Sequence, residues 1–154
     1  MNVILKTFAV LALSVASAAT AIAHSSNEKN PYIVHRQGIY QVAGGHINAL
    51  KAILMLGHPA TTDINYHAKA MLEAFKHHGN AFPSGSDKGK THAKQNVWTD
   101  AEDFKQHGQD AGKALMALIK ASESDDMKLI KSKFAGVGKS CKNCHDEFRK
   151  KGSH

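Results

Sequence analysis

Apolar residues recur along this chain with the three- and four-residue steps of amphipathic helices, and they do so in four separate segments. Residues three and four positions apart lie on the same side of a helix, so each segment predicts one helix with a single interior stripe. In chain order, the four stripes are Ile33, Arg36, Gln37, Tyr40, Ala43, Ile47, Leu50 and Leu54; Ile64, Ala68, Met71 and Phe75; Ala101, Phe104, Gly108, Ala111, Leu115 and Leu118; and Met127, Ile130, Phe134, Val137, Cys141, Cys144 and Phe148.

The breaks between these segments contain residues that begin, end or connect helices. Gly57 ends a first helix over 30–56, and Gly79 ends a second over 62–78. Thr99–Asp100 and Ser124–Asp126 are N-caps for the last two helices, which reach Ala121 and Phe148. Between the two pairs, residues 80–96 form a long linker rich in Gly, Ser and Pro. We therefore expect an all-α fold, an antiparallel up-down four-helix bundle.

The last predicted helix contains Cys141-Lys142-Asn143-Cys144-His145, which is C-x-x-C-H, the attachment motif of a c-type haem. Two thiols three positions apart can bond to the two vinyl groups of one porphyrin, and the histidine can bind its iron as proximal ligand. Thioredoxin-like and zinc sites also use C-x-x-C, but the chain shows no alternating strands and helices and no second C-x-x-C. Both cysteines lie on the interior stripe, so we expect the haem inside the bundle near one end.

The N-terminus has the pattern of a secretory signal. An apolar run from Thr7 to Ala19 is followed by Ala21-Ile22-Ala23, the small-x-small form of a cleavage site. We expect a signal peptide over residues 1–23 and one bundle domain over residues 24–154. The run is too short to cross a membrane, so we expect no membrane insertion. Because haem is attached to c-type cytochromes outside the cytoplasm, the expected location is the periplasm.

The charge of the chain bears on its partners. Its formal net charge of +7 would favour acidic redox partner proteins, although solubility alone also explains such a charge. The lysines are scattered along the whole chain and no recognition motif accompanies them. We therefore expect no binding of nucleic acid.

Taken together, several motifs resemble class II c-type cytochromes, and specifically the cytochrome c′ family, over nearly the whole mature chain. The resemblance implies one covalently bound haem c per chain, a pentacoordinate and mostly high-spin iron, and a homodimer formed through the first two helices. The motifs that carry it are Arg36-Gln37, Phe82-Pro83-Ser84-Gly85-Ser86, Val97-Trp98-Thr99-Asp100 with Phe104, and Val137-Gly138-Lys139-Ser140 before C-x-x-C-H with Asp146, Phe148, Arg149 and Lys150 after it.

The resemblance also implies roles for residues outside the attachment motif. Arg36 and Gln37 would contact the haem propionates, and Tyr40 would cover the distal face of the haem. His92 would touch a haem edge, and Arg149 would tune the proximal histidine. Each residue also has a simpler interpretation: a solvated arginine at a helix end, a core tyrosine, a surface histidine, and a basic residue complementing the last helical turn.

No strong candidate for a sixth iron ligand is evident. Low-spin relatives place a methionine in the first helix, but apart from the initiator this chain has no methionine before Met55, far along that helix. His35 and His46 are weak candidates. The remaining histidines, including His77 and His78, are expected on the surface.

Three functions follow from these expectations. The first two are capture of small diatomic gases (NO, CO) and transfer of single electrons, which rank close together. The alternative to this pair is that the iron is low-spin, in which case the protein only carries electrons. A peroxidase-like enzyme ranks well behind, because it needs a distal acid–base pair and the first helix offers no distal histidine with a partner. We therefore expect no enzymatic activity and assign no catalytic residue.

Overall fold

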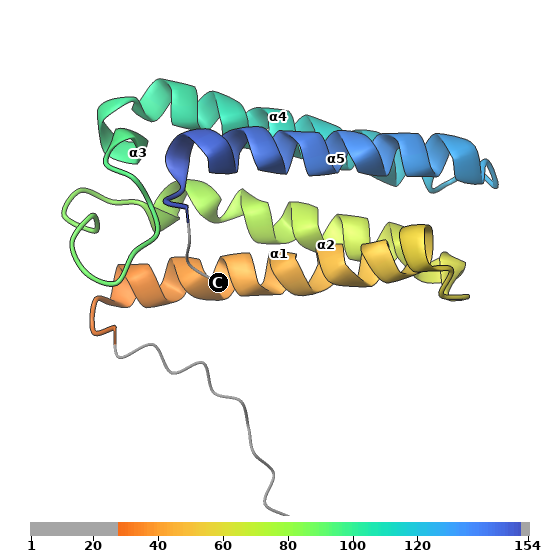
Figure 1. The fold of residues 1–154 in the computed structure, drawn as a ribbon, viewed down its shortest axis with the longest axis horizontal. Helices are drawn as coiled ribbons and strands as arrows, with labels where there is room; N and C mark the ends of the chain where they lie inside the picture. Colours follow the sequence, from red (N-terminus) through yellow and green to blue (C-terminus); the bar gives the residue numbers. More distant parts are fainter. Residues whose placement is uncertain (1–27, 152–154) are drawn as a thin grey trace, which may run out of the picture.

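The computed structural model describes residues 28–151 and is dominated by four long helices (Figure 1). The predicted signal peptide lies outside the described residues. Within them there is no β-strand, only an isolated bridge between Ala93 and Arg149, and no helix is long and apolar enough to cross a membrane. The elements are α1 (Pro31–Leu56), η1 (Thr61–Asp63), α2 (Ile64–Lys76), η2 (His78–Ala81), α3 (Asn96–Thr99), α4 (Ala101–Ala121) and α5 (Met127–Phe148), where η denotes a 3-10 helix.

The long helices form the predicted antiparallel up-down bundle. α1 packs on α2, α2 on α4 and α4 on α5, whereas the backbones of α1 and α5 come close at very few positions. The start of α1, the end of α2, the start of α4 and the end of α5 all lie at one end of the bundle, together with α3 and the long loop (Figure 1). This end, here called the motif end, therefore gathers the residues of the predicted site.

The helix boundaries match the predicted ones at some ends and differ at others. The Asn30 side chain caps α1 by accepting from the Tyr32 N–H at 3.0 Å, and Gly57, at φ +79°, ends it. Asp126 caps α5 as expected, accepting from the Leu129 N–H at 2.9 Å. Asp100 is the N-cap residue of α4, as expected, but its side chain makes no capping hydrogen bond, and a separate short helix, α3, precedes it.

The apolar stripes produce one large core cluster and a smaller one. The smaller cluster lies at the motif end and comprises Val97, Phe104 and Phe148, with Phe82, Ala93, Trp98 and Cys144 packed against it. The stripes are confirmed except at Ala101, which is exposed in the first turn of α4. The larger cluster comprises Leu50, Ile53, Leu54, Ile64, Ala68, Met71, Leu115, Leu118, Ala121, Ile130, Phe134 and Val137.

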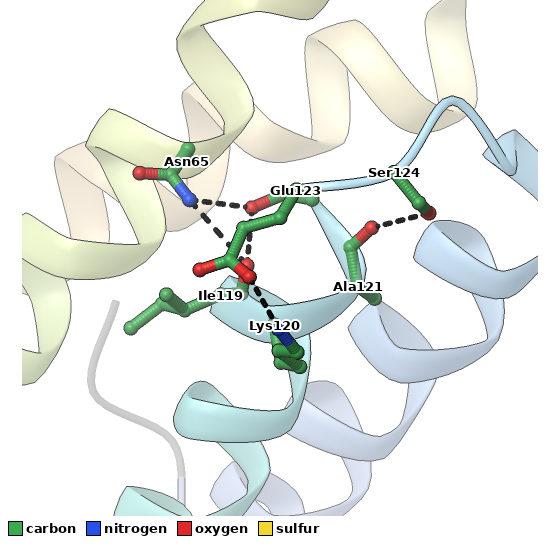
Figure 2. A network of polar contacts seen from close by, with 7 residues as sticks. Asn65, Ile119, Lys120, Ala121, Glu123 and Ser124 are labelled. Carbon is green, nitrogen blue, oxygen red and sulfur yellow. Dashed lines mark hydrogen bonds and ion pairs between the residues drawn. The ribbon is translucent and has the colours of Figure 1, made fainter.

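Polar contacts join α2 to α4 at the opposite end of the bundle (Figure 2). The Asn65 amide donates to the Ser122 hydroxyl at 2.8 Å and to the Ile119 carbonyl at 3.4 Å. The neighbouring Lys120–Glu123 ion pair is exposed and contributes little to stability. This end is thus held by direct contacts between helix termini, without a long loop.

Candidate functional site

The three residues of the attachment motif lie in the last two turns of α5. Cys141 packs against the larger core cluster and Cys144 against the smaller one, so the two thiols lie where the clusters meet. Both cysteines are half-buried and neither forms a disulfide. Burial raises the pKa of both thiols, that of Cys144 to about 11. The thiols are therefore neutral at neutral pH, side by side and without another covalent partner.

These side chains fit a covalently attached porphyrin. The thiols face the bundle interior on the side where the α1 and α5 backbones come close at few positions. Burial, and secondarily the charge of Arg149, lowers the pKa of His145, which favours the neutral imidazole that binds metals. Within residues 28–151, no group of three or more His, Cys, Asp or Glu side chains is placed to hold a metal ion. The zinc alternative therefore gains no support.

Tyr40 lies on the inner side of α1, close enough to the two thiols for their charges to influence its titration. Burial is the main cause that raises its pKa, so the phenol stays protonated at neutral pH. Its ring makes edge contacts with Phe75 and Phe82, at centroid distances of 6.2 and 6.4 Å. Its hydroxyl is hydrogen-bonded to Nε2 of His78. The structure thus brings Tyr40 to the motif end with a polar partner.

His78 is the residue that sequence reasoning missed. We expected it on the surface beside His77, but it is half-buried among aromatic rings, and burial lowers its pKa to about 4. The expectation is wrong because the inner stripe of α2 continues beyond Lys76, the last residue of the helix. Met71 and Phe75 lie on that stripe, and the next three-residue step reaches His78. That spacing was the signal that could have found it.

Arg36 is almost fully buried, and the long loop surrounds it. Its terminal N–H groups donate to the Ser86 carbonyl at 2.7 Å, the Ser86 hydroxyl at 2.9 Å and the Thr91 hydroxyl at 2.6 Å. A weaker contact reaches the Ala81 carbonyl at 3.5 Å. The guanidinium carbon also lies 5.1 Å from the centre of the Phe82 ring. Here the arginine binds neutral loop oxygens, so its contact with a haem propionate stays a prediction.

Gln37 reaches the same loop from the next position of α1. Its amide donates to the Lys90 carbonyl at 3.0 Å. The Trp98 indole donates to the carbonyls of Phe82 and Pro83, each at 3.1 Å. The loop is therefore pinned from both sides, and the propionate contact predicted for Gln37 likewise stays a prediction.

His92 belongs to the long loop and Arg149 follows the end of α5, and the two backbone segments run next to each other there. The His92 carbonyl accepts from the Lys150 N–H at 2.8 Å, while its side chain is exposed. The Arg149 N–H donates to the His145 carbonyl at 3.1 Å, and its positive charge helps to lower the pKa of His145. The structure thus places Arg149 beside His145, and the backbone of His92 beside that of Lys150.

The two weak candidates for a sixth ligand lie away from this site. His35 is exposed and lines a shallow apolar groove on the outer face of α1 and α2. His46 is paired with His67 of α2, with 2.9 Å between their Nδ1 atoms. Neither contacts the aromatic rings around Tyr40 among the described residues.

The sequence and fold of this chain are similar to those of known proteins of one family. The family model described as Cytochrome C' matches residues 32–149. This chain belongs to the cytochrome c′ family. A cytochrome c′ from Pararhodospirillum photometricum is 32% identical over 119 residues, which are 77% of this chain and 95% of that protein. The fold, the family and a covalently bound haem c are thereby confirmed.

Two solved structures of cytochrome c prime from Alcaligenes xylosoxidans show the same fold. One is the nitric oxide complex of a leucine-to-isoleucine mutant, and the other is a leucine-to-glycine variant with carbon monoxide bound. Each has a TM-score of 0.71 and 26% identity, and the match covers 78% of this chain and 94% of the other. Variants of this one relative therefore bind nitric oxide and carbon monoxide on a closely similar bundle.

Proposed function

We propose that this cytochrome c′ binds small diatomic gases, NO and CO, at an iron site that lacks a sixth protein ligand. The observation that carries this proposal is the state of Tyr40. Its pKa is raised by burial and its hydroxyl is engaged by His78, whereas ligation to iron needs the phenolate. The gas complexes of the Alcaligenes xylosoxidans relatives support the same function.

The residues of this chain would divide the work as follows. Cys141 and Cys144 would hold the porphyrin by thioether bonds, and His145 would bind the iron. Arg149 tunes that histidine through its charge, and Tyr40 covers the opposite face. The haem itself supplies the chemistry of gas binding and electron exchange.

The remaining predicted haem contacts depend on the loop. Arg36 keeps one N–H, at Nε, that the loop contacts leave available for a propionate. Gln37 contacts the same loop from α1 and would reach the propionates, and His92 lies within the loop and would reach a haem edge. In this proposal the function is one of binding, without enzymatic turnover, and the protein works in the periplasm after loss of residues 1–23.

Transfer of single electrons is the second candidate function. Exposed lysines surround the attachment motif, among them Lys139, Lys142 and Lys150. Such a basic surface beside a haem would steer acidic partner proteins toward it. An open iron site does not prevent this role, so the two functions can coexist in one protein.

The optical spectrum of the purified haem protein tests the proposal. We expect high-spin bands in the oxidised and reduced forms, and a shift of these bands when NO or CO is added. A low-spin spectrum that is indifferent to both gases would contradict gas binding. It would show a sixth protein ligand and leave electron transfer as the function.

Replacing Tyr40 by alanine should speed the entry of CO. The phenol ring fills space beside the attachment cysteines, so its removal should lower the barrier to entry by at least ~1.4 kcal/mol, or about tenfold in association rate. Flash photolysis of the reduced CO complex measures this rate. Tyr32→Ala is the control, because Tyr32 is an exposed tyrosine of the same helix. An unchanged rate in Tyr40→Ala would contradict the distal role.

We also propose that two copies of the chain pair through α1 and α2. An apolar groove on this face is lined by Val34, Gly38, Ile39, Val42 and Ala74. Val34 and Val42, two turns apart on α1, are 46% and 52% exposed there, and a continuous apolar surface of this kind is typical of a protein–protein contact. A second copy of the same face would cover both, as in the pairing that the family resemblance implies.

Replacing Val42 by glutamate should convert this dimer to a monomer at micromolar concentration. A carboxylate would be buried at the centre of the apolar contact, where it has no partner. Sedimentation of the haem-loaded protein measures the mass. Met116→Glu is the matched control, since Met116 is 53% exposed on α4, outside the groove. A Val42→Glu variant of unchanged mass, or a monomeric wild type, would refute pairing through this face.

A further inference from the structure

His78 has no role in the site described so far, yet its position is unusual for a histidine. It begins η2, separated by one residue from the end of α2, and its ring contacts aromatic side chains at the motif end. Four aromatic rings surround its imidazole, those of Tyr40, Phe75, Phe82 and Phe104, with centroids 5.1 to 6.2 Å away. An apolar side chain would fill this space without the cost of burying two ring nitrogens. A specific polar interaction must therefore offset that cost.

The interaction is the hydrogen bond between Nε2 of His78 and the hydroxyl of Tyr40. Among the described residues, neither group has another hydrogen-bond partner. Since burial keeps the imidazole neutral at neutral pH, one ring nitrogen accepts and the other carries the proton. If the phenol donates to Nε2, only the Nδ1–H lacks a partner. The reverse direction would leave the phenol proton without an acceptor among the described residues, so the phenol is the donor.

We propose that His78 is a positioning residue of the gas site: its Nε2 accepts the phenol proton of Tyr40 and thereby keeps that proton from a bound gas. The inference rests on the proposed function, because it concerns the ligand side of the same haem. Tyr40 then acts on ligands by its bulk and not by hydrogen bonding. Removal of His78 frees the phenol proton and turns Tyr40 into a donor to the bound gas.

The CO complex of the reduced haem protein tests this inference. In His78→Leu, the freed phenol should donate to CO, lower the C–O stretching frequency in the infrared, and slow CO dissociation by about two- to tenfold, the range of one net hydrogen bond. In Tyr40→Phe, which removes only the hydroxyl, both quantities should stay at their wild-type values. The double variant should also match the wild type, because the effect of losing His78 requires the hydroxyl.

Two further variants separate positioning from packing. His78→Gln keeps an acceptor and should restore the wild-type frequency at least in part. His77→Leu, at the exposed neighbouring histidine, should change nothing. If His78→Leu fails to bind haem, Tyr40→Phe alone still decides, since a changed C–O stretch in that variant would show that the phenol proton already reaches CO. An unchanged stretch in His78→Leu would equally overturn the inference.

A ligand-free measurement distinguishes this failure from failure of the proposed function. Urea unfolding of the four haem-loaded proteins (wild type, two single variants and the double variant) forms a double-mutant cycle. Coupling between the two substitutions shows the hydrogen-bonded pair even if the wild type binds no CO, in which case only the proposed function fails. Additive effects would overturn the pair itself. Coupling between the substitutions, together with an unchanged C–O stretch in His78→Leu, would overturn the positioning role.

Discussion

Replacing both Cys141 and Cys144 by alanine should abolish covalent attachment of haem. The two thiols lie three positions apart at the junction of the core clusters, and they are the only cysteines of the chain. No other side chain can form a thioether with a vinyl group. Haem-dependent peroxidase staining after denaturing electrophoresis, where only covalently bound haem remains, should therefore fall from the wild-type signal to none.

The single variants and a matched control sharpen this expectation. Cys141→Ala and Cys144→Ala each keep one thiol, so each should retain at most one thioether and a weaker signal. The double variant Lys142→Ala/Asn143→Ala changes the two intervening residues, which are both exposed, and should stain like the wild type. A full signal in the double cysteine variant would refute attachment through this motif. Loss of signal in the control would show instead that recognition of the motif depends on its intervening residues.

The architecture could be predicted because its determinants are local. Ile64, Ala68 and Met71 recur at three- and four-residue steps, and each is buried against the other long helices. A stripe of that period specifies a helix and its inner face at once. The C-x-x-C-H motif is equally local, and its position on the last stripe was enough to place it at one end of the bundle.

The partners of the site residues could not be predicted, because they depend on how distant segments meet. Arg36 binds Ser86 and Thr91, which lie 50 and 55 positions away in a loop without periodicity. The sequence placed Arg36 on an inner stripe but not its acceptors. His78 differs in kind: its spacing from Phe75 was visible, but the glycine that follows it suggested a helix end on the surface. The structure continues the stripe through a 3-10 turn.

Replacing Arg36 by methionine should destabilise the haem-loaded protein by about 3–4 kcal/mol, near the upper end of single-residue effects. Methionine preserves much of the volume but none of the donors. The carbonyl of Ser86, a residue that is 0% exposed, would lose its donor. The Ser86 and Thr91 hydroxyls would keep only their contacts to Pro83 and Ala93. Because hydrogen bonds to a charged group are stronger than neutral ones, their loss outweighs the burial cost that the cation carries. Urea unfolding at neutral pH measures the difference.

Two further variants test whether the loss of stability in Arg36→Met comes from losing the several N–H donors of the guanidinium group. Arg36→Lys keeps the charge, but one ammonium group cannot reach the separate oxygens of Ser86 and Thr91, so it should recover little of the lost stability. Gln37→Ala removes the neighbouring contact to the Lys90 carbonyl and should cost less than Arg36→Met, because hydrogen bonds of a neutral amide are weaker than those of a charged group. Limited proteolysis should cut the loop over residues 82–95 faster in Arg36→Met than in Gln37→Ala. Equal stability of Arg36→Met and wild type would mean that other contacts, such as those of Trp98 and Gln37, hold the loop. The arginine would then be free to bind the haem propionates, as the family resemblance implies.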